Sequence, residues 1–572
     1  MYCRVLACDF DGTGASNGRL APEVALALGD ARRHGVVTML VTGRVLADLR
    51  EAAVDPRSFD AIVAENGALV WLPDSDRTLQ LAPSPPECFL GSLRRHGIPF
   101  HVGSVVVGTW DRHAGEVLAI VRELGLDSQL VFNRAALMVL PTGVTKASGV
   151  RRALAELGRS ERNMVAFGDA ENDLPLFAVA EVGVAARGAV PGLAAVADEH
   201  LSQPGSAGIA HWVQRMLVHE AQVPTPPRRR IECGTLDDGT VVTLPSSGTD
   251  VLVSGDPKSG KSWVAGLVAE RLLEQGYGLL VIDPEGDYIA LAERCGVLGL
   301  GLDLPLPAPE AVGRLLRQGW SVVVHLSTRA AEERAAYVQQ LLGIVAVTQA
   351  RTGLPHWTLV DEAHYWLGER ALALPALAAR SGYLLLVTYR PSLVAPSVVE
   401  RAGAHLVLRT SVEDERYFVT TQLQTRGPEN VCPAAALAAL DPSHVGLLLR
   451  GPAGVHWQVF TPAPRASRHV HRGRKYAESH VGEERAFRFL DPDGGVVETA
   501  RCVREFCGAV QLVPATSLRR HLLGGDFSRW ARDVLEDDTL AGGLCKLEET
   551  TRAGAPASRG EIVAHVEALY LL

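Results

Sequence analysis

The sequence predicts an α/β protein in which two α/β domains follow one another and a smaller, mainly helical domain completes the chain. Three observations support this fold class. Short apolar segments typical of buried strands alternate with helical patterns along most of the chain. A glycine-rich loop lies between a strand pattern and a helix pattern at residues 251–275. The length of 572 residues accommodates about three or four domains.

The composition and net charge indicate which classes of protein this chain can belong to. The hydrophobic fraction of 47%, the charged fraction of 21% and the mean hydropathy of +0.10 are those of an ordinary globular protein. A net charge of -9 gives no general attraction to nucleic acid, so such a contact would need a local basic patch. The nine cysteines form no paired Cys-x-x-Cys motif, and we expect reduced, mostly buried thiols. Neither a signal-peptide pattern nor a membrane-spanning apolar run is found, so we expect a cytoplasmic protein without membrane contact.

The first predicted strand, residues 2–8, ends in Asp9-Phe10-Asp11-Gly12-Thr13. Two carboxylates two residues apart can share one side of the chain, and Gly12 permits a sharp exit. The pattern is typical of a magnesium and phosphoryl site, although a plain Asp-x-Asp-Gly turn has the same residues.

Three later stretches favour the catalytic interpretation. A second buried strand, residues 37–41, ends in Thr42, which offers a hydroxyl to a phosphate. Lys146 precedes a helical pattern and can neutralise phosphate charge. A strand at residues 163–167 is followed by a cluster of oxygen ligands that includes Asp169 and Asp173 and suits magnesium.

These four motifs, in this order, resemble those of the Cof-type branch of the haloacid dehalogenase (HAD) phosphatases. The resemblance covers residues 1–215 and implies a Rossmann-like HAD core. It also implies that Asp9 is the nucleophile that forms an aspartyl-phosphate and that Asp11 is the general acid and base. Thr42 and Lys146 would hold the phosphoryl group. A degenerate regulatory copy of the enzyme is the alternative.

The same resemblance implies a magnesium site. Asp9, the main-chain carbonyl of Asp11 and Asp169 would bind Mg²⁺, with support from Asp173. The surplus chain at about residues 81–137 mixes short helix and strand patterns, and it resembles the α+β cap that covers the active site in this branch. An unrelated binding insert is the alternative for these residues.

Residues 216–230 form a predicted linker that contains three prolines and ends in Arg228-Arg229-Arg230, which we expect to be solvated. A predicted ATPase domain follows at residues 231–465. Its phosphate loop lets backbone N–H groups surround phosphate oxygens, while Lys261 supplies positive charge and the Ser262 hydroxyl can ligate magnesium. An accidental glycine- and serine-rich turn is the alternative. The predicted nucleotide-binding residues of the loop are Gly255, Asp256, Pro257, Lys258, Ser259, Gly260, Lys261 and Ser262.

Short apolar strands at residues 277–282, 321–325, 357–360, 383–387 and 405–408 alternate with helical patterns and predict a parallel sheet. The strand at 357–360 ends in an acidic pair. We expect Asp361 near the magnesium of bound ATP and Glu362 where it polarises the attacking water.

This region resembles the HerA/FtsK branch of RecA-like ATPases through residues 282–288, 361–364 and 388–392. The family usually carries Gln where this chain has Tyr389. By this resemblance Arg409 is the candidate arginine finger that acts on a neighbouring subunit, and assembly into a homo-oligomer stays open. A surface arginine that pairs with Glu413 or Asp414 is the equally weighted alternative for Arg409.

Residues 466–482 are a predicted basic linker, with nucleic-acid or phosphate contact as the alternative. Residues 483–572 combine a strand-and-turn region with helical patterns, and we expect a small interaction domain without chemistry of its own.

Together these patterns predict a magnesium-dependent phosphatase that acts on a small phosphate ester and is joined to an ATP-binding, ATP-hydrolysing domain. The alternatives are an ATP-driven nucleic-acid motor with an accessory phosphatase and a regulatory protein gated by ATP binding. A sugar phosphate or a phosphoglycolate-like ester is the hypothesis for the substrate, from the modest size of the cap.

Overall fold

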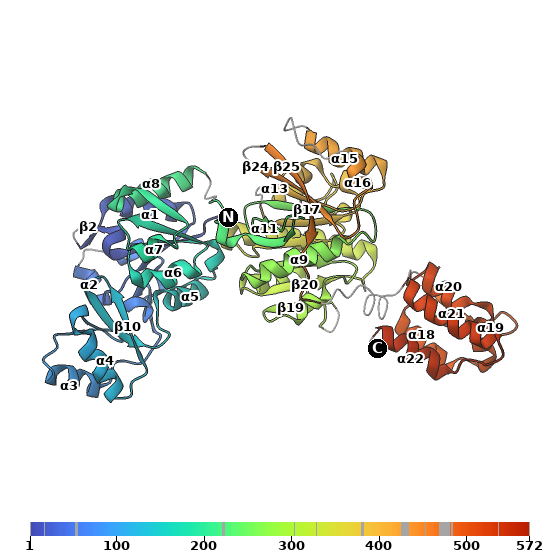
Figure 1. Ribbon diagram of the computed structural model, residues 1–572, viewed down its shortest axis with the longest axis horizontal. Coiled ribbons are helices and arrows are strands. Elements are labelled where there is room, and N and C mark those ends of the chain that lie inside the picture. The colour runs from blue at the N-terminus through green and yellow to red at the C-terminus, as the bar shows by residue number, and fades with distance from the viewer. Residues whose placement is uncertain are drawn as a thin grey trace.

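The computed structural model shows three bodies along the chain, with a cap attached to the first (Figure 1). The first body contains the N-terminal residues, the second contains the phosphate loop, and the third contains the C-terminal helices. The structure describes residues 2–16, 18–51, 55–219, 223–301, 304–327, 329–378, 382–424, 434–451, 454–467, 481, 484–535 and 537–570.

The first body is built on an 8-stranded sheet in the order β14-β13-β12-β1-β4-β5-β6-β7. The strands from β14 to β5 are parallel, and β6 and β7 are added antiparallel. Buried residues of α1 and α8 cover one face of the sheet, and those of α5 and α6 cover the other. Its elements are β1 (Val5–Asp9), β2 (Ala15–Ser16), β3 (Arg19–Leu20), α1 (Pro22–Arg33), β4 (Val37–Val41), α2 (Leu46–Glu51), β5 (Ala61–Ala64), β6 (Leu69–Leu72), β7 (Arg77–Gln80), α5 (Lys146–Leu157), β12 (Met164–Gly168), α6 (Leu174–Val179), β13 (Val182–Arg187), α7 (Pro191–Ala194), β14 (Glu199–Pro204) and α8 (Gly205–Val218).

The cap is a 4-stranded antiparallel sheet in the order β10-β11-β9-β8 with two helices. Leu137 and Val139 of β11 pack with the helices, whereas Met138 and Leu140 pack with residues of the first body. The helices therefore lie on the face of the cap sheet that points away from the core. The cap elements are α3 (Glu87–Arg95), β8 (His101–Val102), β9 (Val107–Trp110), α4 (Ala114–Glu123), β10 (Ser128–Asn133) and β11 (Ala136–Pro141).

The second body contains an 11-stranded sheet in the order β16-β15-β25-β24-β23-β17-β22-β21-β18-β20-β19. The seven strands from β23 to β19 are parallel, as predicted from the alternating pattern, and the other four are antiparallel. Its elements are β15 (Ile231–Thr235), β16 (Val241–Leu244), β17 (Asp250–Ser254), α9 (Lys261–Glu274), β18 (Leu279–Asp283), β19 (Val297–Leu300), α10 (Pro309–Arg317), β20 (Ser321–His325), α11 (Ala331–Thr352), β21 (Trp357–Val360), α12 (Ala363–Trp366), α13 (Leu374–Ala378), β22 (Leu384–Thr388), α14 (Pro396–Val399), β23 (Ala402–Val407), α15 (Glu413–Gln424), α16 (Ala434–Ala438), β24 (Val445–Gly451) and β25 (Gly454–Pro462).

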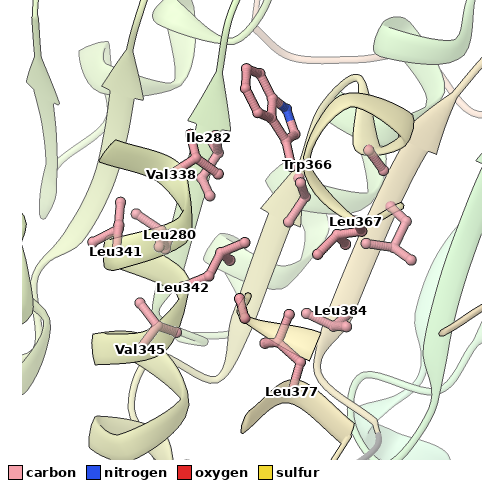
Figure 2. Packing of buried hydrophobic residues seen from close by; sticks show 14 of the residues in the cluster. Leu280, Ile282, Val338, Leu341, Leu342, Val345, Trp366, Leu367, Leu377 and Leu384 are labelled. Atoms are coloured by element: carbon pink, nitrogen blue, oxygen red, sulfur yellow. The ribbon is translucent and has the colours of Figure 1, made fainter. Parts of the chain in front are cut away.

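Helices cover both faces of this sheet. Figure 2 shows one face, where Val338, Leu341, Leu342 and Val345 of α11 lie against the strand residue Leu280. These helical residues recur at intervals of three and four positions, so they form one apolar stripe. The other face packs on α9.

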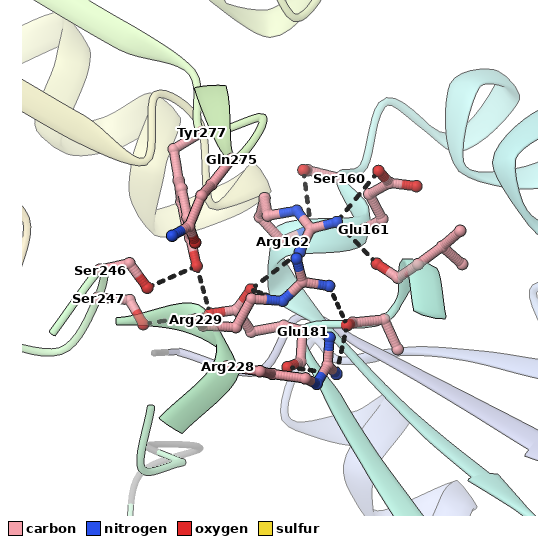
Figure 3. A network of polar contacts seen from close by, with 12 residues as sticks. Ser160, Glu161, Arg162, Glu181, Arg228, Arg229, Ser246, Ser247, Gln275 and Tyr277 are labelled. Carbon is pink, nitrogen blue, oxygen red and sulfur yellow. Dashed lines mark hydrogen bonds and ion pairs between the residues drawn. The ribbon is translucent and has the colours of Figure 1, made fainter. Parts of the chain in front are cut away.

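The first and second bodies meet at a buried carboxylate, Glu181, whose exposure is 0% (Figure 3). Tyr277 of the second body donates its hydroxyl hydrogen to Glu181 Oε1 over 2.6 Å. Arg162 Nη1 lies 3.4 Å and Arg229 Nε lies 3.7 Å from Glu181 Oε2. A charged group at this position requires such partners, because an isolated buried carboxylate is strongly disfavoured.

The predicted linker is partly built into this contact. Arg228 Nη2 lies 2.7 Å from Asp198 Oδ2, and Arg229 donates to the carbonyl of Ala180 over 2.8 Å. The side chain of Arg229 is only 12% exposed. The expectation that these arginines are solvated is therefore wrong, because carboxylates and free carbonyls of the first body bind them.

The third body packs five helices on a two-stranded hairpin around one apolar cluster. Its elements are β26 (Phe487–Leu490), β27 (Val496–Ala500), α18 (Val503–Leu512), α19 (Ala515–Gly524), α20 (Asp526–Asp533), α21 (Asp538–Arg552) and α22 (Arg559–Tyr570). Residues 468–480 and 482 of the predicted basic linker lie outside the described residues. Among the helices that the structure describes, none combines the length and the apolar character needed to cross a membrane.

Candidate functional site

Four of the predicted catalytic and metal-ligating side chains meet above the carboxyl ends of β1 and β12. Lys146, at the start of α5, places Nζ 2.5 Å from Asp9 Oδ1 and 2.6 Å from Asp173 Oδ1. One oxygen of each of Asp9, Asp169 and Asp173 lies within 4.8 Å of the others. Asp9 is the last residue of β1, and the two later aspartates follow β12, which pairs with β1. The parallel sheet therefore brings their side chains to one edge.

The charges in this cluster are buried and mutually dependent. Burial raises the pKa of Asp9 well above its ordinary value, and the neighbouring Asp173 adds to this effect while Lys146 opposes it. Burial alone would lower the pKa of Lys146, but Asp173 and Asp9 outweigh it and the pKa is raised. Lys146 therefore remains a cation that neutralises two carboxylates in a site of low polarity.

The loop after β1 depends on Gly12. Its φ of +79° is in the left-handed region, and a Cβ at this position would lie 2.3 Å from Asp169 Oδ2. The adjacent Thr13 hydroxyl donates to Asp169 Oδ1 over 3.2 Å. A glycine at this position thus lets the loop of β1 approach the loop of β12.

Asp11 points toward a different partner from Asp9. Arg44 donates two hydrogen bonds to the Asp11 carboxylate, from Nε over 2.8 Å and from Nη2 over 2.6 Å. The Arg44 guanidinium also lies over the Phe10 ring at 4.9 Å. Arg44 belongs to the sequence motif Thr42-Gly43-Arg44, but its pairing with Asp11 was not predicted because only the folded chain brings the two loops together.

Thr42 is buried at the end of β4, beside β1. Its hydroxyl oxygen accepts a hydrogen bond from the Arg44 backbone N–H over 3.1 Å. The hydroxyl hydrogen remains available in this geometry to donate to a phosphate oxygen.

Two further residues of the site were missed from the sequence. Arg134, in the turn between β10 and β11 of the cap, forms an ion pair with Asp169 through Nη2 and Oδ2. Glu65, buried after β5, accepts hydrogen bonds from the backbone N–H groups of Ser104, Val105 and Val106 over 2.9, 2.8 and 3.0 Å. The only sequence feature that could have indicated these two residues is that each lies in a short turn between apolar strands.

This donor set fits a hard divalent cation. Carboxylate oxygens are the ligands that Mg²⁺ prefers, and three carboxylates converge here. In the described structure the cationic groups of Lys146 and Arg134 contact them.

The phosphate loop joins β17 to α9 as predicted. Gly255, Lys258 and Gly260 have φ values of 158°, 64° and 100°, which give the loop its tight curvature. Lys261 Nζ donates to the Asp256 carbonyl over 2.8 Å, within the loop. The Asp256 carboxylate accepts the Ser411 N–H with both oxygens at 2.9 Å.

Two polar groups of this loop suit a phosphate ligand. Among the described residues, the buried Ser259 hydroxyl oxygen has no hydrogen-bond partner. Burial lowers the pKa of Lys261, while Glu362 and Asp361 oppose that effect. A bound phosphate would supply acceptors to Ser259 and an opposite charge to Lys261.

The predicted acidic pair lies at the end of β21, which is separated from β17 by β22. Asp361 is buried, and burial raises its pKa well above its ordinary value, with Asp287 and Glu362 adding to the effect. Glu362 has a left-handed φ of 48°, and its Oε2 lies 3.4 Å from His364 Nδ1. Burial lowers the pKa of His364 to about 4, with Arg390 and Lys261 contributing.

Tyr389 and Arg409 both lie beside the phosphate loop. Lys261 Nζ is 6.0 Å from the centre of the Tyr389 ring, which meets His364 edge-on with ring centres 4.6 Å apart. The Arg409 carbonyl accepts the Asp256 N–H over 2.8 Å, and its side chain is exposed. In the described part of the chain, Arg409 forms no ion pair with Glu413 or Asp414.

Comparison with protein families supports both halves of this arrangement. Residues 124–213 match the model of haloacid dehalogenase-like hydrolases. Residues 254–336, which include Lys261 and Ser262, match the model of the central domain of the helicase HerA.

The chain is also similar to characterised proteins over its first body. It is 28% identical over 221 residues to a phosphoglycolate phosphatase of Methanothermobacter thermautotrophicus, covering 37% of this chain and 99% of that protein. It is 31% identical over 220 residues to a phosphoglycolate phosphatase of Halorubrum lacusprofundi, covering 36% of this chain and 94% of that protein. A solved haloacid dehalogenase-like hydrolase from Bacteroides thetaiotaomicron is 17% identical, with a TM-score of 0.32 and coverage of 37% of this chain and 99% of that one.

A family model and the relatives agree on the class of the first body, and a second family model matches the part of the second body that contains the phosphate loop. The chain belongs to the haloacid dehalogenase-like hydrolases, as a phosphatase of that family joined to a HerA-type P-loop ATPase domain.

Proposed function

We propose that the first body hydrolyses a small phosphate monoester through a phosphorylated Asp9 and that the second binds and hydrolyses ATP. The observation that carries the phosphatase proposal is the position of Asp9. Its carboxylate is buried at the end of β1, 2.5 Å from the Lys146 cation and close to two more carboxylates. A nucleophilic carboxylate needs such a cation, because the phosphoryl group brings further negative charge.

In the first step an Asp9 oxygen attacks phosphorus, and the bond from phosphorus to the ester oxygen breaks. Asp11 gives the leaving alcohol its proton, and Thr42 and Lys146 hold the phosphoryl oxygens. In the second step Asp11 takes a proton from water, whose oxygen attacks the phosphoaspartate and releases phosphate and free Asp9. The Arg44 contact, at 2.6 and 2.8 Å, orients the Asp11 carboxylate before the reaction.

Asp9, the main-chain carbonyl of Asp11 and Asp169 would hold Mg²⁺, and Asp173 would support Asp169 and Lys146. The support for this role is that Asp173 Oδ2 accepts the N–H groups of Asp169 and Ala170 over 3.0 and 3.1 Å. When bound, the metal neutralises the developing charge on the phosphoryl oxygens.

The substrate that we propose is a small carboxylated ester of the phosphoglycolate type. The relatives in question are named phosphoglycolate phosphatases and are covered over 99% and 94% of their length. The cap has four short strands and two helices, and a cover of this size suits a small ester. A sugar phosphate is the second candidate.

In the second body, the N–H groups of residues 255–262 would surround the phosphates of ATP, with Lys261 at the β- and γ-phosphates. Ser262 and Asp361 would hold its Mg²⁺, and Glu362 would orient the attacking water. Arg409, exposed beside the loop, would act on a nucleotide in a homo-oligomer. The domain is either a motor on nucleic acid or a switch that ATP binding sets. ATP turnover that rises with DNA and falls steeply with salt indicates the motor, and binding without turnover indicates the switch.

Phosphate release from a panel of small monoesters, with and without Mg²⁺ and ATP, tests both proposals. Asp9→Asn should abolish ester hydrolysis and retain ATP turnover, whereas Lys261→Ala should do the reverse. Reactions with ATP alone separate the two sources of phosphate. Ester hydrolysis that survives in Asp9→Asn would contradict the mechanism, and ATP turnover that survives in Lys261→Ala would contradict the role of the loop.

A further inference from the structure

Arg134 of the cap is held by its backbone above the catalytic carboxylates. It lies in the turn between β10 and β11 with a left-handed φ of 52°. Its backbone N–H donates to Glu171 Oε2 over 3.1 Å, in the loop that follows β12. The turn is therefore fixed to the catalytic loop as well as to the cap sheet.

The cap as a whole rests on the first body at two further points. The Glu65 carboxylate accepts three consecutive N–H groups of the cap loop at residues 104–106. Met138 of β11 packs against Gly43, where a Cβ would lie 3.1 Å from its sulfur. These contacts fix the position of the cap, and therefore of the turn that carries Arg134, relative to the catalytic carboxylates.

The core-facing side of the cap sheet adds little charge of its own. Side chains alternate along a strand, so Met138 shares its face with Ala136 and with the residues paired opposite them. Gly108 and Val131 pair with Met138, and Trp110 and Asn133 pair with Ala136. His101 pairs with Gly108 on the same face, and its Nε2 lies 3.8 Å from Asp48 Oδ2 of the first body. The other side chains named here are apolar or amide groups, so Arg134 is the arginine that this face of the sheet brings to the site.

The Arg134 guanidinium contacts the carboxylate of Asp169 from the solvent side. Its side chain is 55% exposed, whereas that of Asp169 is 2% exposed. Lys146 is 1% exposed and lies between Asp9 and Asp173, so it has no such freedom to move. Arg134 is the cation of this cluster whose exposed side chain can turn from Asp169 to a ligand.

Asp169 is also a candidate ligand of Mg²⁺, and two cations compete for its charge. A bound metal ion would weaken the attraction that holds the guanidinium to Asp169, and repulsion between the two cations would favour its release. The turn would keep the freed guanidinium at the edge of the site, within reach of a group that extends beyond the phosphate of a bound ester. A guanidinium binds a carboxylate with two parallel hydrogen bonds, which gives both affinity and selectivity.

The geometry points to Arg134 as the residue that selects the substrate, by binding a carboxylate adjacent to the phosphate ester. This inference rests on the proposed phosphatase function and adds the group that recognises the acidic end of the substrate. Arg134 is thus a specificity residue, and the phosphoryl chemistry remains with Asp9 and Asp11.

The test compares two esters that differ only in the acidic group. 2-Phosphoglycolate carries the carboxylate, and 2-hydroxyethyl phosphate has a hydroxymethyl group in its place. Arg134→Gln should lower kcat/KM for 2-phosphoglycolate about 10- to 100-fold, mainly through KM, because a charge-assisted hydrogen bond is lost. For 2-hydroxyethyl phosphate the change should stay within about threefold. Arg134→Lys should recover part of the loss, since it retains the charge without the planar pair of donors.

Arg122→Gln is the matched control, because Arg122 is an exposed arginine on α4, on the face of the cap sheet away from the site. It should leave both esters unaffected. A second measurement needs no turnover. Calorimetric titration with Mg²⁺ alone should show tighter binding to Arg134→Gln than to the wild type, because the competing cation at Asp169 is gone.

The outcomes distinguish failure of the proposed role of Arg134 from failure of the proposed phosphatase function. An equal loss for both esters would overturn the inference and make Arg134 a general support of the metal site. An unchanged Mg²⁺ affinity would overturn the exchange at Asp169. Failure of the wild type to hydrolyse either ester, with Mg²⁺ bound normally, would instead refute the proposed function on which the inference rests.

Discussion

Replacement of Tyr277 by Phe removes one hydroxyl from the contact between the first and second bodies. That hydroxyl donates to Glu181 Oε1 over 2.6 Å and contacts Ser246 Oγ at 2.7 Å. Burial raises the pKa of Tyr277, and Glu181 raises it further, so the hydroxyl remains protonated and acts as a donor. The aromatic ring would stay, including its edge-on contact with His356 at 5.6 Å between centres.

A hydrogen bond to a charged group contributes about 1.5–3 kcal/mol, and here its loss leaves a fully buried carboxylate with one donor fewer. For a body of this size, about 2 kcal/mol corresponds to a fall of about 4–8 °C in the unfolding temperature. Differential scanning calorimetry of the full chain should detect this in the first transition. Tyr417→Phe is the matched control, since Tyr417 belongs to the same body and is 71% exposed. A decrease no larger than that of the control would refute the reasoning.

Three further predictions concern the rest of the chain. Gly12→Ala should lower ester hydrolysis at least about 100-fold, because its Cβ would lie 2.3 Å from Asp169 Oδ2. Gly115→Ala is the control and should leave the rate unchanged, because no atom lies within 4 Å of the Cβ at that position. Phosphate release from the ester measures both variants. Leu342→Ala, in the buried face of α11, should cost about 2–5 kcal/mol in urea unfolding, and a cost below about 1 kcal/mol would contradict the packing of Figure 2. Burial lowers the pKa of His356 to about 3, so the unfolded chain takes up its proton first as pH falls below about 6.5. Stability of the second body should therefore decrease from pH 7 to pH 5, by up to about 1.4 kcal/mol per pH unit from this residue, and equal unfolding temperatures at both pH values would contradict it.

Much of the fold could be predicted because its sequence signals are local. The predicted strands at residues 37–41, 321–325 and 357–360 agree with β4, β20 and β21 to the residue. The α/β class of both large bodies and the helical class of the third are confirmed. Most residues chosen for the sites lie at or just after the ends of such strands, and parallel pairing then brings them to one edge, whereas Lys146 begins α5.

The remainder could not be predicted because it depends on contacts between segments far apart in the chain. Arg134 reaches Asp169 across 35 residues, and Glu181 meets Tyr277 across 96. A sequence pattern does not show which surface an arginine will meet, and Arg228 and Arg229 were expected to be solvated for that reason. The catalytic roles of the site residues, including Asp9 and Glu362, stay predictions.

The contact at Glu181 has a consequence for the inheritance of this gene. Arg228 and Arg229 lie outside the predicted phosphatase boundaries, yet they bind Asp198, Ala180 and Glu181 within them. A recombination event that moved only residues 1–215 into another gene would leave these acceptors without their arginines. Exchange of the phosphatase as an independent module is therefore disfavoured, and substitutions on the two sides of the contact should be inherited in compatible pairs.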